Sequence, residues 1–226
     1  MKARLTRVML GTLSLLGALN VGNALAADQS SMAVDLRRIE LEWAHITYQL
    51  PSSDEQDRQM RALATQAAQL VARYPGRPEP LIWDGIVTSS EAKYAGSFSA
   101  MGFAKDARDL FEKAGRIDYR AVDGSVPISL GALYYLVPGF PLGFGDNDKA
   151  RKYLEQGIQM NPNGLDANYF YADFLYRQGE YEKSATVLKH GLSVPADPQR
   201  PVWDAGRRSE MRALLSKVNQ RLASGG

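Results

Sequence analysis

Four residues in the C-terminal half recur 34 positions further along the chain. Ala150, Leu154, Gly157 and Ile158 are matched in turn by Ser184, Leu188, Gly191 and Leu192. A fixed period of this size is typical of stacked helical hairpins, in which one supersecondary unit is repeated. Because a single hairpin cannot bury its own apolar face, such units stack on one another. The spacing therefore predicts an all-α solenoid.

Apolar residues at steps of three and four predict where the helices lie. They indicate about four helix pairs and a final capping helix. Ser53 and Gln56 form a predicted capping box, and Asp146 or Asn147 is predicted to cap a later helix. The expected helices cover residues 35–50 and 53–74, 79–92 and 103–115, 127–136 and 146–161, 166–178 and 181–192, and finally 202–223.

The first 26 residues have the three-part layout of a secretory signal peptide. Lys2, Arg4 and Arg7 precede an apolar run over residues 8–19, and small residues flank a predicted cut after Ala26. An uncleaved membrane anchor is the alternative, but the run is short for a span of about 20 residues. We therefore expect a periplasmic or secreted protein, with residues 27–32 as a loose N-terminus and no stable membrane insertion after cleavage.

Charge and cysteine content exclude several classes. The chain has 27 basic and 25 acidic residues. The predicted signal peptide holds three of the basic residues and none of the acidic ones, so the remainder carries a net charge of −1. This composition does not favour nucleic-acid binding, which needs a clustered cationic surface. The absence of cysteine excludes disulfides, thiolate metal sites and cysteine nucleophiles.

Residues 165–198 resemble a tetratricopeptide repeat (TPR) unit, and residues 131–164 resemble a second one. The packing positions of the first are Tyr171, Ala172, Leu175, Ser184, Leu188 and Gly191. The resemblance implies a right-handed superhelix, formed by residues 27–226 as a single domain, with a concave groove that binds a protein or peptide partner. The chain is also similar to the T component of periplasmic TRAP-transporter systems, the TatT-like family. Members of that family are commonly lipoproteins, whereas this chain has no cysteine.

The candidate binding residues come from the first helices of the last two pairs and from one loop. In TPR-like arrays the first helix of each pair lines the groove, and in that register Tyr135, Tyr169, Asp173 and Tyr176 face it. On the second pair the counterparts are Asp84, Thr88 and Glu91. Phe140 and Phe144 lie in the Pro/Gly-rich segment 138–145, which would be the lid or wall of a pocket if the chain binds a small ligand. The alternative is that the tyrosines fill gaps between helices and the loop packs on the stack.

The chain offers little for catalysis or metal binding. His45 and His190 lie in different helices without neighbours at ligand spacing. The acidic run 146–148 lacks the spacing of a calcium loop and is explained by helix capping. We therefore predict no metal, no cofactor and no enzymatic activity.

Two functions remain open at this point. The first is a scaffold that binds a peptide segment or partner protein in its groove, with a transport-system component as one candidate partner. The second is a small apolar ligand held under the 138–145 loop. An open, wet groove favours the first, and an enclosed apolar cavity beneath the loop favours the second.

Overall fold

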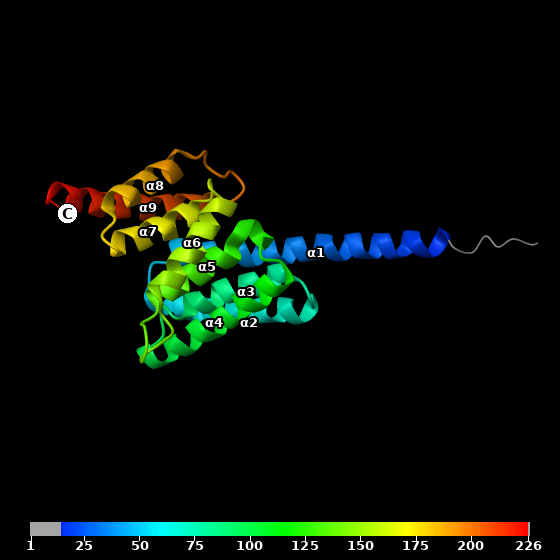
Figure 1. Cartoon of the computed structure of the whole chain (residues 1–226). Helices are drawn as coiled ribbons and strands as arrows, with labels where there is room; N and C mark the ends of the chain where they lie inside the picture. The colour runs from blue at the N-terminus through cyan, green and yellow to red at the C-terminus, as the bar shows by residue number, and fades with distance from the viewer. Residues whose placement is uncertain (1–14, 226) are drawn as a thin grey trace, which may run out of the picture.

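The structure, a computed structural model, describes the backbone of residues 15–225 and the side chains of residues 27–96 and 99–225. Within this range the chain forms nine helices and no strand, which confirms the all-α prediction (Figure 1). No described helix is long and apolar enough to span a membrane. The helices are α1 (Leu15–Tyr48), α2 (Ser53–Arg73), α3 (Pro78–Glu91), α4 (Ser97–Ile117), α5 (Ala121–Leu136), α6 (Asn147–Met160), α7 (Leu165–Arg177), α8 (Tyr181–Ser193) and α9 (Pro201–Ala223).

The helices form four successive hairpins, α1/α2, α3/α4, α5/α6 and α7/α8, followed by α9. The first helices of the hairpins contact one another in order, and α7 contacts α9. The predicted superhelix of four pairs with a capping helix is therefore confirmed. In addition α9 packs against α1, so the inner helices α1, α3, α5, α7 and α9 make a closed circuit.

The residues of the 34-residue period lie in the core. Leu154 is 1% exposed and Leu188 is 0% exposed. The two glycines mark places where neighbouring helices approach closely. A Cβ on Gly157 would lie 2.6 Å from Ile128 Cγ1, and one on Gly191 would lie 2.5 Å from Met211 Cε. The period therefore marks close contacts between neighbouring helices, within the α5/α6 hairpin at Gly157 and from α8 onto α9 at Gly191.

Capping was predicted correctly at one helix and shifted by a residue at another. The Asp146 carboxylate accepts from the backbone amides of residues 148 and 149 at the start of α6. At α2 the cap is Ser52, whose hydroxyl accepts from the amide of Glu55, and not Ser53. The Gln56 side chain reaches back to the carbonyl of Leu50, so it still closes the helix start.

Three helix starts differ from the prediction. The first helix extends N-terminally through the predicted cut after Ala26 and through the expected loose stretch 27–32, where Met32 is buried. Residues 1–14 of the predicted signal peptide lie outside the described residues. The fourth helix begins at residue 97 instead of 103.

The third difference is a left-handed turn inside α5. Val122, Asp123 and Gly124 have φ angles of 50°, 53° and 76°. Pro127 therefore falls in the first turn of the regular segment, where its missing amide costs no helical hydrogen bond. Pro127 correctly indicated where the regular part of the helix begins, but the left-handed turn over residues 122–124 was not predicted.

The circuit of inner helices is closed by specific contacts between α1 and α9. The Tyr48 ring packs against Gly206, where a Cβ would lie 2.4 Å from the ring. The Tyr48 hydroxyl donates to Glu210 at 3.2 Å, and Arg200 pairs with Glu40 at 3.3 Å. Glycine at position 206 thus lets the first and last helices meet.

Candidate functional site

A pocket of about 560 Å³ lies within the circuit of inner helices. Its walls come from α1, α3, α4, α5 and α7, with one residue, Arg207, from α9. This volume is in the range of pockets that bind small molecules or single anchoring segments. Through Arg207 the last helix also borders the pocket.

Small side chains create the hollow. On α5 the lining positions follow the i, i+3, i+4 spacing of one helix face, from Ser125 to Leu136, a helical length of about 16 Å. Facing positions on α3 and α4 are also small. The small lining residues are Ser89, Ser90, Ala92, Ala100, Ala104, Ser125, Ser129 and Ala132.

Larger apolar side chains form the remaining wall of the pocket. They come from five different helices, so no single element could make the hollow alone. Trp43 of α1 is held in this wall by its indole nitrogen, which donates to the Ser90 hydroxyl at 2.9 Å. The other large apolar lining residues include Ile86, Phe111, Ile128, Leu133, Leu136 and Phe170.

An ion pair occupies one corner of the pocket. Arg207 is 6% exposed and its Nε lies 2.7 Å from Asp166 Oδ1. The angle between them is not that of a hydrogen bond, so both atoms lack a hydrogen-bond partner among the described residues. Burial disfavours the charge of Arg207, but Asp166, Tyr48 and Glu210 together raise its pKa above its usual value. The guanidinium therefore stays charged beside the pocket.

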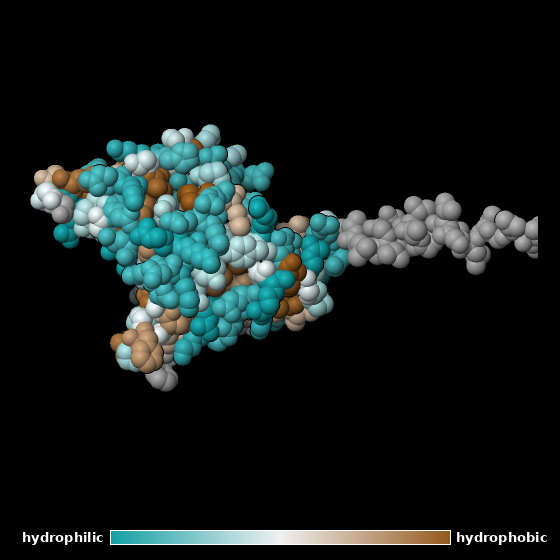
Figure 2. All heavy atoms as spheres, viewed as in Figure 1, coloured by the Kyte–Doolittle hydropathy of each residue, from teal (hydrophilic) through white to brown (hydrophobic). Residues whose placement is uncertain are grey.

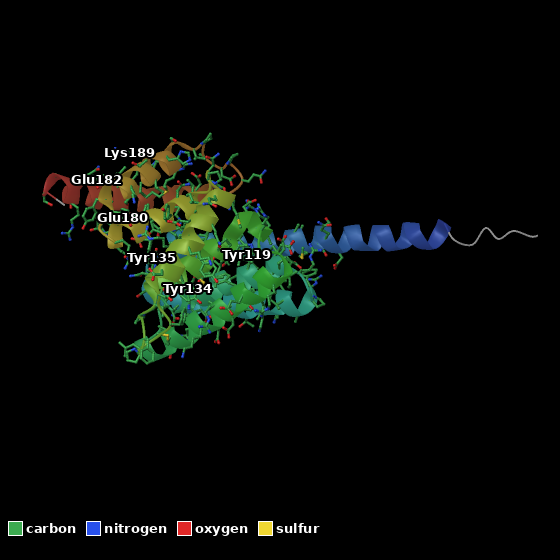
Figure 3. All side chains as sticks on the ribbon, in the orientation of Figure 1. Tyr119, Tyr134, Tyr135, Glu180, Glu182 and Lys189 are labelled. Carbon is green, nitrogen blue, oxygen red and sulfur yellow. The ribbon has the colours of Figure 1, made fainter. Side chains whose placement is uncertain are left out.

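The predicted groove residues of α5 and α7 lie beside the pocket and not in its lining. The Tyr135 hydroxyl donates to Asp173 Oδ2 at 2.9 Å, and Arg177 pairs with the same carboxylate at 2.9 Å. Burial, followed by the nearby Asp173 carboxylate, raises the pKa of Tyr135 well above 10. Arg207 lies 4.5 Å over the Tyr169 ring. We call Tyr135, Tyr169, Asp173, Arg177 and Arg207 the tyrosine belt; Figure 3 labels Tyr135 on α5.

The other predicted residues also lie outside the pocket lining. Tyr176 packs against Tyr181 at the α7–α8 junction, with ring centroids 5.6 Å apart. Phe144 packs edge-on to Tyr134 at 5.6 Å, and Arg108 lies 4.6 Å over its ring. Phe140 is 94% exposed. The expected lid does not cover the pocket, because Phe144 is pinned to α5 and Phe140 points into solvent.

On α3 the predicted register was wrong by one helix face. Asp84, Thr88 and Glu91 are each 8% exposed and do not line the pocket. Burial raises the pKa of Asp84 to about 6, against a smaller lowering by Thr88. Glu91 lies on the same face near Arg61 of α2, and burial raises its pKa as well. The pocket instead uses Ile86 and its neighbours on the adjacent face.

The pocket was not predicted from the sequence, because small side chains and not polar aromatic ones create the hollow. The available signal was the spacing of small residues: Ser125, Ser129 and Ala132 form a stripe on one helix that is otherwise rich in bulky residues. No group of three or more potential metal ligands occurs among the described side chains.

Comparison with known proteins supports the repeat architecture. The family model for the tetratricopeptide repeat matches residues 142–217. No curated protein matches the chain. A thermophilic TPR protein in Thermus thermophilus has a crystal structure similar to this one, with a TM-score of 0.54 and 15% identity over 88% of this chain and 96% of that one. The crystal structure of MamA has a TM-score of 0.42 and 16% identity, covering 78% of this chain and 97% of that one.

The matched region contains α6 to α8 and most of α9, which includes both copies of the 34-residue period. The Thermus structure extends the similarity in fold to the earlier hairpins. The family match therefore shows that residues 142–217 consist of tetratricopeptide repeats, and the Thermus structure shows that the chain as a whole has the fold of such a protein.

Proposed function

We propose that the protein is a non-catalytic scaffold that binds an apolar segment of a partner protein in the pocket between its inner helices. The observation that carries this proposal is the apolar hollow of about 560 Å³, whose wall at Leu136 continues onto exposed apolar surface. Burial of apolar side chains is the main favourable term in most protein–protein association. A small ligand would have no use for the apolar surface outside the pocket.

The polar groups of the pocket define what the segment should carry. Its apolar side chains would lie along α5, and a hydrogen-bonding group would face the Asp166–Arg207 ion pair. Hydrogen bonds to charged groups are stronger than those between neutral groups, so a segment that supplies such a group gains affinity and specificity.

Binding of a small apolar ligand is the second candidate. Its specific support is the closure of α9 on α1, which surrounds the hollow by protein on several sides. The resemblance to TRAP-transporter T components, which the sequence suggests and the comparisons do not show, would then imply service to a transport system. In that case the loop 138–145 forms part of the pocket wall and does not cover the pocket, since only Pro138 of that loop lines it.

Photocrosslinking in the cells that make the protein separates the two candidates. A photoreactive residue at Ser129 lies in the pocket, and one at Val34, which is 68% exposed on α1, is the matched control. Partner binding predicts protein-sized adducts from position 129 only, whereas ligand binding predicts adducts of small mass. Filling the pocket by Ala132→Trp should abolish either adduct. Adducts that persist in that variant would contradict both candidates.

The proposal includes export of the protein. It rests on the layout of the first 26 residues, with a basic start, an apolar run and a small-x-small site. Fractionation of the producing cells, with N-terminal sequencing of the mature chain, tests it. The expected result is a periplasmic or secreted protein that begins at residue 27; a cytoplasmic chain with its first 26 residues retained would refute it.

A further inference from the structure

The loop between α5 and α6 carries a strongly exposed apolar tip. Phe140 is 94% exposed and Leu142 is 77% exposed, and we call these two residues the loop tip. Leu136, at the end of α5, is 49% exposed. In Figure 2 the hydrophobic colour gathers on a projection at the lower left, where Figure 1 places this loop. A contiguous exposed apolar surface of this kind marks an interaction site.

The base of the loop holds the tip in this exposed position. The amide of Gly145 donates to the carbonyl of Pro138 at 2.9 Å, and the amide of Asp146 donates to the carbonyl of Tyr134 at 2.8 Å. The contacts of Phe144 with Tyr134 and Arg108 fix the second half of the loop. Because the loop is already ordered, its docking loses little conformational entropy.

The loop tip and the pocket are neighbours on the molecule. Val137 and Pro138 line the pocket at the point where the loop leaves α5. The tip itself does not enter this pocket, since its exposure remains high and the loop base is fixed. A surface that carries an apolar projection next to an apolar hollow can pair with a copy of itself. When two copies are related by a two-fold axis, the loop tip of each can dock against the pocket of the other.

We propose that two copies of the chain associate face to face, each placing its loop tip against the pocket of the other. This inference rests on the proposed function and names the occupant of the pocket as a second copy. Phe140 and Leu142 together expose about 300 Å². Two reciprocal contacts, counting tip and wall, then bury about 1,200 Å², which exceeds the roughly 1,000 Å² expected of a specific interface.

Sedimentation velocity of the protein as its cells process it tests the proposal. The native chain should sediment as a dimer at micromolar concentration. The double variant Phe140→Asp/Leu142→Asp should associate at least 100-fold more weakly, because two charges would have to enter an apolar hollow. These positions are on an exposed loop, so the variant keeps its fold. The matched control Val34→Asp/Leu41→Asp, at exposed apolar positions of α1, should remain dimeric.

Complementation between variants tests the reciprocity. Ala132→Trp, and independently Ser129→Leu, should fill the pocket and weaken association in the same way. Mixing a pocket-filled variant with the tip variant should restore one of the two contacts and produce a heterodimer that neither variant forms alone. Circular dichroism establishes that the pocket-filled variants keep the native helix content.

The outcomes separate this inference from the proposed function. A native chain that is monomeric at every concentration, or a tip variant that stays dimeric, overturns the reciprocal docking. If position 129 still captures a different protein in that case, the proposed function stands without the second copy. Pocket-filled variants that leave both dimerisation and crosslinking unchanged would overturn both.

Discussion

Two neighbouring surfaces of α5 and α7 are built in opposite ways. The tyrosine belt is a network in which the Tyr135 hydroxyl, the Asp173 carboxylate and the Arg177 guanidinium satisfy one another. The pocket face has small side chains at Ser129 and Ala132 and leaves space unfilled. The aromatic residues with polar tips thus hold the hairpins together, and the small residues make room for something else. Side-chain size, more than aromatic content, marks where this repeat protein has space to bind.

The largest expected effect comes from the one residue that belongs to both surfaces. Arg207→Met should lower the free energy of unfolding by about 2 to 3 kcal/mol, because the buried guanidinium loses its ion pairs with Asp166 and Glu210. The exposed pair provides the control: Arg177→Met, whose side chain is 50% exposed, should cost less than about 1 kcal/mol. Urea denaturation of the two variants measures the difference. Equal losses of unfolding free energy would contradict the distinction between the buried and the exposed arginine.

The second effect separates the two faces of α3. Burial raises the pKa of Asp84 to about 6 from 3.8, so protonation is favoured in the folded state. The associated stability is present below pH 4 and is lost as the pH rises through 6. Asp84→Asn should remove this loss and stabilise the protein by about 2 kcal/mol at pH 7.

Denaturation across the pH range tests the prediction for Asp84. The pKa of Glu91 is also raised by burial, so the variant should retain a smaller decrease in the same direction. Parallel curves for native chain and variant at all pH values would show that Asp84 is not responsible.

The third prediction makes the same substitution on both surfaces. Ala172 is fully buried between helices, and Ala172→Leu should cost about 1 to 3 kcal/mol because the space is already filled. Ala132→Leu adds the same atoms to the pocket wall and should leave stability unchanged or raise it by up to about 1 kcal/mol. Thermal melts of the pair measure the contrast. A comparable loss at position 132 would mean that the hollow cannot accept side chains.

The smallest effect concerns one hydrogen bond of the tyrosine belt. Tyr135→Phe should cost about 1 kcal/mol, because Asp173 keeps its contact with Arg177. In the background of Asp173→Ala the same change should cost less, since the acceptor is gone. A double-mutant cycle from urea denaturation gives this coupling energy, and no coupling would place Tyr135 outside the network.

The fold was predictable from the sequence to a large extent, and the site was not. Leu154, Leu188 and their glycines showed the repeat because core contacts between identical hairpins recur at a constant distance in the chain. Asp84 and Ile86 show where prediction failed. Both are compatible with a helical pattern, and only the neighbouring helix decides which face it covers. Tyr135 and Tyr169 were correctly placed on inner helices, but their partners Asp173 and Arg207 decided that they pack beside the pocket.

The sequence by itself determined the helical hairpins, their order and the residues that hold successive pairs together, because these depend on local periodicity and on contacts between neighbours in the chain. Only the tertiary structure decided that α9 meets α1 at Gly206 and Tyr48. That contact joins residues 158 positions apart, so it depends on how all the intervening hairpins stack. Six helices line the pocket, so the pocket is a property of the whole array and is encoded in no single repeat.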